Sequence, residues 1–567
     1  MLKYLTKSKL FVIIFVLTSL VYSAGTAAIA LVLAAIIEAA TGDSINELII
    51  IAAFAFAFLV LYVILQYVYE KLKNTMLMNA AKKLKSDVFS SIMSKDIPDF
   101  EKRNSASYIN ELTTNVNMVG DLYFSNFFAL LHLSVSFLTA VIITVYFQPA
   151  LLLVMFLLGA LSFAVSKFTG KGIDTIAQSV SESSQVYQVG IKEYFSGFRI
   201  IKTFSILNHI NALHDTKNDD MENRKLSYKL KVTLVGCISL LVGFSSTIAI
   251  MGVTAALSIR GLVSVGAVFA VGHLMGQVTS PITSLPGILV NFKSAKPIIA
   301  ALNEFLNSKP QEDANNETNE VSPDGFKRIE IRDMSFAYGE SPALASVNLT
   351  FESGKKYVIV GGSGSGKTTL ISLLLGYYDN YDGSIKYGEH EVKSIKKANI
   401  YKMVGSVLQE TFLFDDTLKN NLTLYDDRFT ESEINEAVKH SGLTEFVDGY
   451  PGKLNGSITE NGKNISGGER QRISLARVLL RKQPALLLDE FTGSLDSEKA
   501  FEIEQYLLTR REITLIAITH RLNKALLKQY DSVIVLRNGQ VAEHGSYEEL
   551  VNTNGGLDAL LSVSDRL

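Results

Sequence analysis

The sequence predicts two parts of different fold class: an α-helical membrane domain of six spans with long extensions beyond the membrane, and then a soluble α/β domain. Three observations support this prediction. The 567 residues are 48% hydrophobic and only 19% charged, below the roughly 25% charged residues usual for soluble domains. The long apolar runs are confined to residues 1–300. Residues 307–567 instead have the pattern of an ordinary soluble α/β domain.

Charge and cysteine content exclude several classes of protein. The 54 basic and 56 acidic residues nearly cancel, so no global charge favours nucleic-acid binding. The single cysteine, Cys237, lies in an apolar run and cannot form an internal disulfide. A disulfide-framed secreted protein and a zinc finger are therefore excluded.

Six apolar segments are long enough to cross the roughly 30 Å hydrocarbon layer, which takes about 20 residues. They are approximately 10–39, 48–70, 123–147, 149–168, 232–258 and 263–290. The first could be a signal peptide, since it follows three lysines. Its apolar run is about twice the 7–15 residues of a signal segment, and no clear cleavage site follows, so a membrane anchor is expected.

Basic residues indicate the orientation of these spans. The second-to-third and fourth-to-fifth connections are long and rich in Lys and Arg, while the other connections are short and poor in both. Positive loops mark the cytoplasmic side. Both termini and both long connections are therefore expected on the cytoplasmic side of the cell membrane (plasma or inner). Helical patterning in these connections predicts that the helices continue beyond the bilayer. A polar linker, Asn307–Gly325, then separates domain 1–306 from domain 326–567.

Polar groups within the spans are candidates for a pathway, because ionisable groups there are functional hypotheses by default. They are Glu38, Gln66, Asn126, His132, His273 and Gln277. The first two lie near span ends, where an interfacial position is favoured. The two histidines could equally be interhelical hydrogen bonders. The sixth span, with Gly272, Gly276, Pro281 and Pro286, is expected to bend and to line the pathway.

The first motif of the soluble domain that indicates chemistry is a phosphate-binding loop. The strand Tyr357–Val360 leads into G-x-x-x-x-G-K-[ST], and a helix begins at Thr369. Backbone N–H groups of such a loop turn toward phosphates at a helix N-terminus, while the lysine reaches β and γ oxygens and the threonine hydroxyl binds Mg²⁺. The expected nucleotide-binding residues are Gly361, Gly362, Ser363, Gly364, Ser365, Gly366, Lys367, Thr368 and Thr369.

Two acidic residues end a second buried strand, 485–488. Asp489 is expected to hold the Mg²⁺ shell, as the corresponding aspartate does in P-loop NTPases. Glu490, adjacent but on a different heading, is expected to polarise an attacking water. By itself this pair is common at strand ends in any α/β protein.

A second anion nest precedes another helix, at Ser466, Gly467 and Gly468. One nucleotide pocket has no need of a second nest in the same chain. It would be useful if two copies meet face to face and each completes the site of the other. A simple helix cap is the alternative.

Taken together, these motifs resemble those of an ATP-binding cassette (ABC) half-transporter of the exporter type, in which six membrane helices are fused to a C-terminal nucleotide-binding domain. The resemblance covers nearly the whole chain, and the motifs occur in the family's order. They are Tyr338, the P-loop 361–368, Gln409, the signature 465–469, the strand ending in Asp489 and Glu490, the run Ser494-Leu495-Asp496, and His520.

The resemblance implies a role for each of these residues. Tyr338 would stack on adenine, Gln409 would contact Mg²⁺ and the attacking water, and His520 would hold the γ-phosphate and support Glu490. Ser466, Gly467 and Gly468 would grip the γ-phosphate bound by the opposite domain, and Asp496 would cross the dimer seam. The long connections would supply coupling helices near 103–113 and 207–217, docking beside Gln409.

Two departures from the family pattern stand out. The signature is ISGGE where LSGGQ is usual, with the nest residues retained. In the segment Thr459-Glu460-Asn461-Gly462, Asn461 replaces the usual arginine of the cross-talk loop. The chain also begins almost directly with the first span, so a leader-cleaving peptide exporter is not expected.

The resemblance implies an ATP-hydrolysing primary transporter that works by alternating access with ATP and Mg²⁺. Export of a lipid, drug-like or peptide compound is favoured. Import of a siderophore-like compound and a non-transporting, ATP-gated channel or regulator remain alternatives. The expected partners are membrane lipid, an unidentified substrate and a second half-transporter chain, with a homodimer favoured over a heterodimer and no nucleic acid.

Overall fold

The structure, a computed structural model of the chain, describes residues 1–5, 9–42, 44–307, 327–409, 411–459, 462–553 and 555–564. They form two compact units. The membrane unit is Met1–Lys95 with Arg103–Lys309, and the soluble unit is Asp96–Lys102 with Pro310–Leu567. Apart from Asn307, which ends a helix, the predicted linker Asn307–Gly325 lies outside the described residues, as do Glu460 and Asn461.

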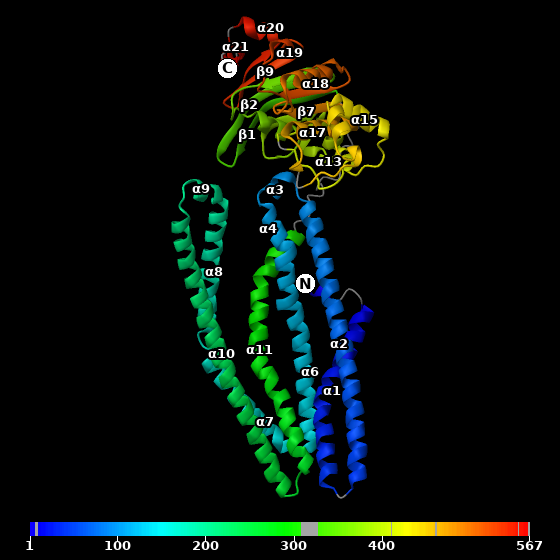
Figure 1. Ribbon diagram of the computed structural model, residues 1–567, viewed down its shortest axis with the longest axis vertical. Helices are drawn as coiled ribbons and strands as arrows, with labels where there is room; N and C mark the ends of the chain where they lie inside the picture. Colours follow the sequence, from blue (N-terminus) through cyan, green and yellow to red (C-terminus); the bar gives the residue numbers. More distant parts are fainter. Residues whose placement is uncertain are drawn as a thin grey trace. The chain divides into compact units, whose positions relative to one another are not determined.

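In the described residues of the membrane unit, every regular element is a helix (Figure 1). Within the described residues, six helices are long and apolar enough to cross a membrane: Phe11–Thr41, Ile45–Met93, Ser105–Phe147, Pro149–Thr169, Leu207–Ile259 and Val265–Asn307. At about 1.5 Å per residue, the 49 residues of the second are far longer than the roughly 30 Å of hydrocarbon. The helices therefore extend well beyond the bilayer, and the predicted fold class is confirmed.

The elements of this unit follow one another with short breaks. They are α1 (Lys9–Thr41), α2 (Ile45–Met93), α4 (Ser105–Asn110), the π-turns Glu111–Asn115 and Gly120–Phe124 flanking α5 (Val116–Val119), α6 (Ser125–Phe147), α7 (Pro149–Thr169), α8 (Ile173–Ser196), α9 (Phe198–Thr203), α10 (Leu207–Ile259) and α11 (Val265–Asn307).

Helix α11 forms the centre of this unit and packs on α1, α6, α7 and α10. Small residues permit the close approach, as is usual between helices in lipid. A Cβ on Gly266 would lie 2.3 Å from the carbonyl oxygen of Ala34 in α1. Pro281, Pro286 and Pro297 lie inside α11, which curves along its length in Figure 1, as expected of prolines that remove helix hydrogen bonds.

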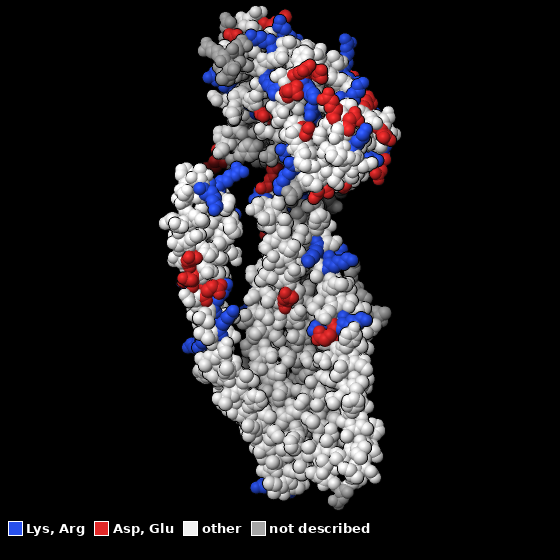
Figure 2. Space-filling view, in the orientation of Figure 1, with Lys and Arg blue, Asp and Glu red and all other residues white. Residues whose placement is uncertain are grey.

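The charge distribution agrees with a lipid environment. Figure 2 shows that one end of the membrane unit, around α1, α2, α7 and the lower part of α10, exposes almost no charged side chains on the face drawn. Exposed residues there are large and apolar, such as Phe54, Phe56 and Leu241, each more than two-thirds exposed. Such a surface is stable only against lipid or another apolar surface.

The soluble unit is an α/β domain with two sheets. The order of the larger sheet is β10-β9-β3-β8-β7-β6, and that of the smaller is β2-β1-β4-β5. The strands are β1 (Arg328–Tyr338), β2 (Ser341–Glu352), β3 (Lys356–Val360), β4 (Asp382–Tyr387), β5 (His390–Glu391), β6 (Val404–Val407), β7 (Ala485–Asp489), β8 (Thr514–Ile518), β9 (Ser532–Arg537) and β10 (Gln540–Gly545). Strands β6, β7, β8, β3 and β9 are parallel. Their carboxyl ends therefore share one edge, where ligands bind in such sheets.

Helices cover this sheet and form a separate lobe. They are α12 (Lys367–Leu374), α13 (Lys397–Met403), α14 (Leu418–Thr423), α15 (Glu431–His440), α16 (Thr444–Gly449), α17 (Gly467–Arg481), α18 (Ser497–Thr509), α19 (Lys524–Leu527), α20 (Tyr547–Asn552) and α21 (Gly556–Ser564). Residues of α14, α15, α16 and α17 share a core of their own. The N-terminus of α17 therefore belongs to this lobe.

The predicted coupling helices are misplaced. The short helix that joins the soluble unit is α3 (Ile97–Glu101), where Asp96 forms a 2.9 Å ion pair with Lys397. The predicted segment 103–113 belongs to the membrane unit. The segment 207–217 starts the 53-residue α10, and the short helix of that connection is α9. Both predictions missed in the same direction, because the short helix precedes the long one that returns to the membrane.

Candidate functional site

The phosphate loop lies between the buried strand β3 and α12. Gly361, Gly364 and Gly366 have φ values of +155°, +75° and +100°, which glycine adopts without a steric penalty. At two of them a side chain would also collide: a Cβ on Gly361 would lie 2.3 Å from the oxygen of Leu536, and one on Gly366 would lie 2.6 Å from Leu344. The sequence therefore needs glycine at these positions to turn its N–H groups inward.

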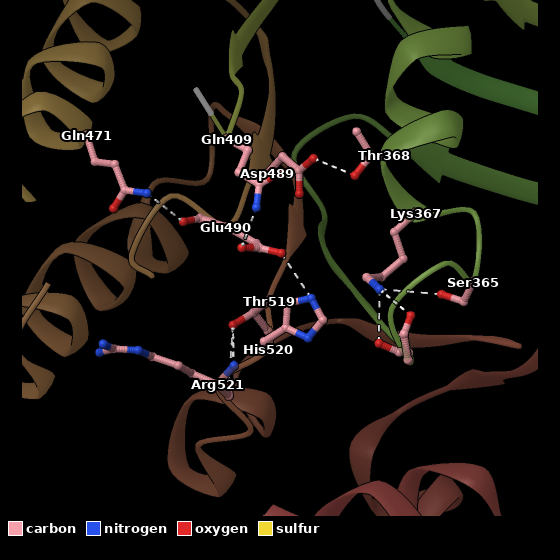
Figure 3. Close-up of polar contacts among 12 residues, drawn as sticks. Ser365, Lys367, Thr368, Gln409, Gln471, Asp489, Glu490, Thr519, His520 and Arg521 are labelled. Carbon is pink, nitrogen blue, oxygen red and sulfur yellow. Dashed lines mark hydrogen bonds and ion pairs between the residues drawn. The ribbon is translucent and has the colours of Figure 1, made fainter. Parts of the chain in front are cut away.

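Lys367 curls back over this loop. Its ammonium donates to the carbonyl oxygens of Gly361 at 3.0 Å and Gly362 at 2.8 Å (Figure 3). Burial lowers the pKa of Lys367, and the carboxylates of Glu490 and Asp489 act in the opposite direction. An anion within the loop would stabilise the charged form further, so this geometry fits a phosphate.

The two acidic residues at the end of β7 point in different directions, as predicted. Asp489, only 2% exposed, accepts a 2.9 Å hydrogen bond from the Thr368 hydroxyl. Burial raises the pKa of Asp489, and that hydrogen bond opposes the shift. The hydroxyl and the carboxylate thus form a pair of hard oxygen ligands of the kind that Mg²⁺ prefers.

Glu490 lies at the centre of a second group. Its carboxylate is 3.0 Å from His520 Nε2 and accepts a 3.4 Å hydrogen bond from Gln409 Nε2 (Figure 3). The structure therefore brings together three residues that are 81 and 30 positions apart in sequence, since β6, β7 and β8 end at the same edge. Glu490 has φ of +50°, a conformation that costs a non-glycine residue of order 1–3 kcal/mol and clusters at functional sites.

Backbone contacts hold Glu490 in this conformation. Its N–H donates to Ile518 at 3.1 Å. Its carbonyl accepts from Gln471 Nε2 at 3.2 Å, and Gln471 Oε1 accepts from the N–H of Ser494 at 3.0 Å. Sequence reasoning missed Gln471, although it lies only three residues after the predicted nest. A polar side chain on the buried face of an amphipathic helix was the available signal, because such groups need partners.

Arg521 is a second residue that sequence reasoning missed. Its guanidinium donates to the carbonyl oxygens of Leu495 at 2.6 Å and Gly493 at 3.3 Å, and its N–H donates to Thr519 Oγ1 at 3.0 Å. It therefore ties the end of β8, which carries His520, to the loop that leads to Asp496. Asp496 caps α18 by accepting from the N–H of Lys499.

The signature segment begins α17. Ser466 is the N-cap, and Glu469 completes a capping box by accepting a 2.8 Å hydrogen bond from the N–H of Ser466. The acidic residue that departs from the family pattern therefore serves the helix N-terminus, where negative charge is favourable. Gly468 packs so closely on Ser494 that a Cβ would lie 2.8 Å from its oxygen.

Tyr338 ends β1 and is 45% exposed. Its hydroxyl lies 3.4 Å from Thr369 Oγ1, and its ring meets those of Phe336 and Tyr378 edge-on. This contact with α12 places Tyr338 next to the phosphate loop.

The polar residues of the spans bond across helices. Gln277 Nε2 and His273 Nε2 both lie at the carbonyl oxygen of Thr26, at 2.8 and 3.3 Å. His132 Nδ1 lies 2.7 Å from the hydroxyl of Ser23. Asn126 accepts from Asn291. Of the two interpretations, interhelical hydrogen bonding therefore describes these contacts, and Glu38 and Gln66 are exposed.

Comparisons with known proteins agree with this geometry. The family model described as ABC transporter transmembrane region matches residues 12–282, and the model described as ABC transporter matches 344–493. An uncharacterized ABC transporter ATP-binding protein of Sinorhizobium fredii is 31% identical over 72% of this chain and 70% of its own. An ATP-dependent lipid A-core flippase of Syntrophus aciditrophicus is 29% identical over 83% of this chain and 78% of its own.

A solved structure shares the fold. The structure of a bacterial Atm1-family ABC exporter with ATP bound matches with a TM-score of 0.84 over 98% of both chains at 18% sequence identity. The six apolar helices, the matching ABC transporter family model and the 31% identical relative all indicate the same family. The chain therefore belongs to the ABC transporter family, as a multi-pass membrane protein that joins an exporter-type membrane domain to an ATP-hydrolysing domain and couples ATP hydrolysis to transport.

Proposed function

We propose that this chain forms a homodimer that exports a lipid-like amphiphile, with its nucleotide-binding domain in the cytoplasm. The observation that carries the proposal is the complete set of groups around Glu490, which supports a working ATPase rather than a regulatory remnant. Several relatives at 25–29% identity bear the name ATP-dependent lipid A-core flippase. They support an amphiphilic substrate here.

In the proposed reaction, Glu490 orients and deprotonates the attacking water, and His520 holds that carboxylate and the γ-phosphate. Lys367 neutralises charge on the γ-phosphoryl oxygens, while Gln409 contacts the water from the end of β6. These are positioning and electrostatic roles, which dominate phosphoryl transfer. The 3.0 Å contact between His520 and Glu490 is the strongest support for the pair acting together.

Thr368, Asp489 and Gln409 would hold Mg²⁺. The contact of Thr368 with Asp489 supports two of these ligands, and few protein ligands suffice because Mg²⁺ keeps waters and binds substrate phosphates. When bound, the ion neutralises negative charge on the β- and γ-phosphate oxygens.

A dimer is required to complete the site. Ser466, Gly467 and Gly468 form an anion nest at the N-terminus of the 15-residue α17. The phosphate loop of the same chain already has Lys367 to bind its phosphate, so the nest is not needed there. We propose that each nest grips the γ-phosphate held by the other chain and that Asp496 lies at the seam. The exposed side of Tyr338 stacks on adenine.

The test is ATP-driven lipid movement in vesicles. The purified chain is reconstituted into vesicles of phosphatidylethanolamine and phosphatidylglycerol that contain a trace of nitrobenzoxadiazole-labelled phosphatidylethanolamine. ATP outside energises molecules whose nucleotide-binding domains face outward, so export moves label into the inner leaflet and protects it from dithionite. Protection should require Mg-ATP and disappear in Glu490→Gln, while the exposed control Glu502→Gln keeps it.

The alternatives give other results. Label that moves equally without ATP indicates a channel or scramblase, and loss of protection on adding ATP indicates import. Either result contradicts export. Glu490→Gln should lower turnover by a factor of about 100 or more, the scale of removing a catalytic base, and keep nucleotide binding. Normal hydrolysis in this variant would remove Glu490 from its proposed role.

A further inference from the structure

The cytoplasmic end of α11 carries a feature that the nucleotide site does not explain. Phe305 lies in the last turn of α11 and is only 2% exposed. Lys95 Nζ lies 5.5 Å from the centre of its ring, and the Arg103 guanidinium carbon lies 4.9 Å from it. Both distances are within the roughly 6 Å range of a cation–π interaction. One aromatic ring thus binds two cations.

Other contacts fasten the same turn. The Ser91 hydroxyl donates to the carbonyl oxygen of Phe305, and Tyr108, 4% exposed, meets the ring edge-on at 6.1 Å. Arg103 also donates to the carboxylate of Glu304 at 3.2 Å. Arg103 therefore has two partners in the last turn of α11, the Phe305 ring and the Glu304 carboxylate.

The two cations, Lys95 and Arg103, flank the chain segment that groups with the soluble unit. Lys95 is the last residue of the membrane unit before Asp96–Lys102, the segment that groups with the soluble unit, and Arg103 is the first residue after it. Within that segment, Asp96 binds Lys397 of α13, and Ile97 lines a groove with Tyr377 and Tyr401. The two ends of the docked segment are therefore held on one side chain of the membrane unit.

Phe305 also stands at the second covalent route between the units. Helix α11 ends at Asn307, and the chain continues from there into the nucleotide-binding domain. Each chain has two connections of this kind, the α3 segment and the end of α11, and both meet at Phe305. Residues at such a junction decide whether two connections move together or separately.

We propose that Phe305 is a positioning residue that locks the α3 segment to the end of α11, so that closure of the nucleotide-binding domains moves both connections as one body. This inference rests on the proposed dimer and deepens it by naming how ATP binding is transmitted. Without the ring, the soluble unit would still bind ATP, but α3 and α11 would move independently and the membrane helices would not follow.

The test measures that movement without needing a substrate. Cys237 is the single cysteine, so Cys237→Ser gives a background free of cysteine. Leu262, 56% exposed between α10 and α11, is changed to Cys and spin-labelled, and Glu490→Gln holds ATP without hydrolysis. Pulsed electron resonance then gives the distance between the two labels of a dimer in nanodiscs, with and without ATP.

In this reference chain ATP should shift the distance. Adding Phe305→Leu, which keeps an apolar side chain but removes the ring face, should abolish the shift while ATP binding changes by less than about two-fold, because no nucleotide contact is altered. Lys95→Gln with Arg103→Gln should do the same, and Lys95→Arg with Arg103→Lys should restore the shift, since the cations return.

The outcomes separate the two proposals. A reference chain that shows no pair distance, or no ATP-dependent shift, contradicts the proposed dimer or its alternating access. A reference chain that shifts, with a Phe305→Leu chain that shifts equally, overturns the positioning role. Combining Phe305→Leu with the two neutralising substitutions should give the same result as Phe305→Leu alone, because one shared contact is already lost.

Discussion

At the scale of single residues, the site is defined by how Glu490 is held. Its left-handed backbone, the carboxylate contacts to His520 and Gln409, and the hydrogen bond from Gln471 all converge on one strand end. Residues adjacent to Glu490 in the sequence could not supply these contacts, because His520, Gln409 and Gln471 each belong to a different strand end or helix. The strain at Glu490 is therefore retained by long-range contacts.

Gln471 offers a sharp test of this arrangement. Gln471→Leu removes the donor to the Glu490 carbonyl and the acceptor for Ser494. Because a single hydrogen bond is worth about 0.5–1.5 kcal/mol, kcat for ATP should fall by up to about ten-fold. KM should stay unchanged, since no nucleotide contact is lost.

A matched control is Gln529→Leu. Gln529 is an exposed glutamine that also donates to a backbone carbonyl, that of Ala525. This variant should keep kcat. If Gln471→Leu also kept the kcat of the unmodified chain, Gln471 would have no part in holding Glu490.

At the scale of elements, the N-terminus of α17 explains the unusual signature. Capping boxes also begin α15, with Thr430 and Glu433, and α20, with Ser546 and Glu549. A glutamate three residues after the N-cap is thus a repeated device of this chain. At α17 the same device orients Ser466, the first residue of the proposed nest.

Substitution of Glu469 tests whether the cap of α17 supports ATPase activity as well as stability. Glu469→Gln keeps the hydrogen bond to the N-cap backbone and should leave both stability and ATPase activity near those of the unmodified chain. Glu469→Ala loses it and should cost ~1 kcal/mol of stability, the scale of a lost cap, together with ATPase activity.

The comparison is Glu549→Ala, which removes the same capping bond from α20. It should show the loss of stability in a thermal unfolding measurement but normal ATPase activity. If both alanine variants had equal, unchanged ATPase activity, the cap of α17 would not serve the nest.

Local patterns predicted most elements, and long-range contacts account for what they missed. The buried strand before the phosphate loop and the apolar spans follow from periodicity and length alone, which act within about 20 residues. The coupling segment did not, because α3 is a short helix with Pro98 in its first turn and its location depends on the contact with Lys397. The partners of Gln471 are 19 and 23 residues away, and Ser91 is 214 residues from Phe305, so neither contact belongs to the periodicity of one helix or strand.

At the scale of the whole molecule, the proposed ATPase needs two chains, because each proposed site takes its parts from both. The phosphate loop and Glu490 belong to one half of each proposed site, and the nest of Ser466, Gly467 and Gly468 belongs to the other. A chain with a defective phosphate loop should therefore still lend a working nest to its partner. This division predicts complementation between two inactive chains.

The measurement that tests this claim most directly uses two such variants. Lys367→Ala disables the phosphate loop. Gly467→Asp places a carboxylate in the nest at a position where an added Cβ would come no closer than 3.7 Å to Ser494, so the fold should be kept. Each variant carries a different tag, and dimers are purified alone or, after co-expression, through both tags in sequence.

Each variant alone should be inactive, because every site in its dimer has one defective half. The mixed dimer has one site with both defects and one with none, so about half of the wild-type ATPase activity should return if the intact site works alone, with a lower fraction if the two sites cooperate. A mixed dimer as inactive as its parents, or a Gly467→Asp chain that is active by itself, would contradict the shared site.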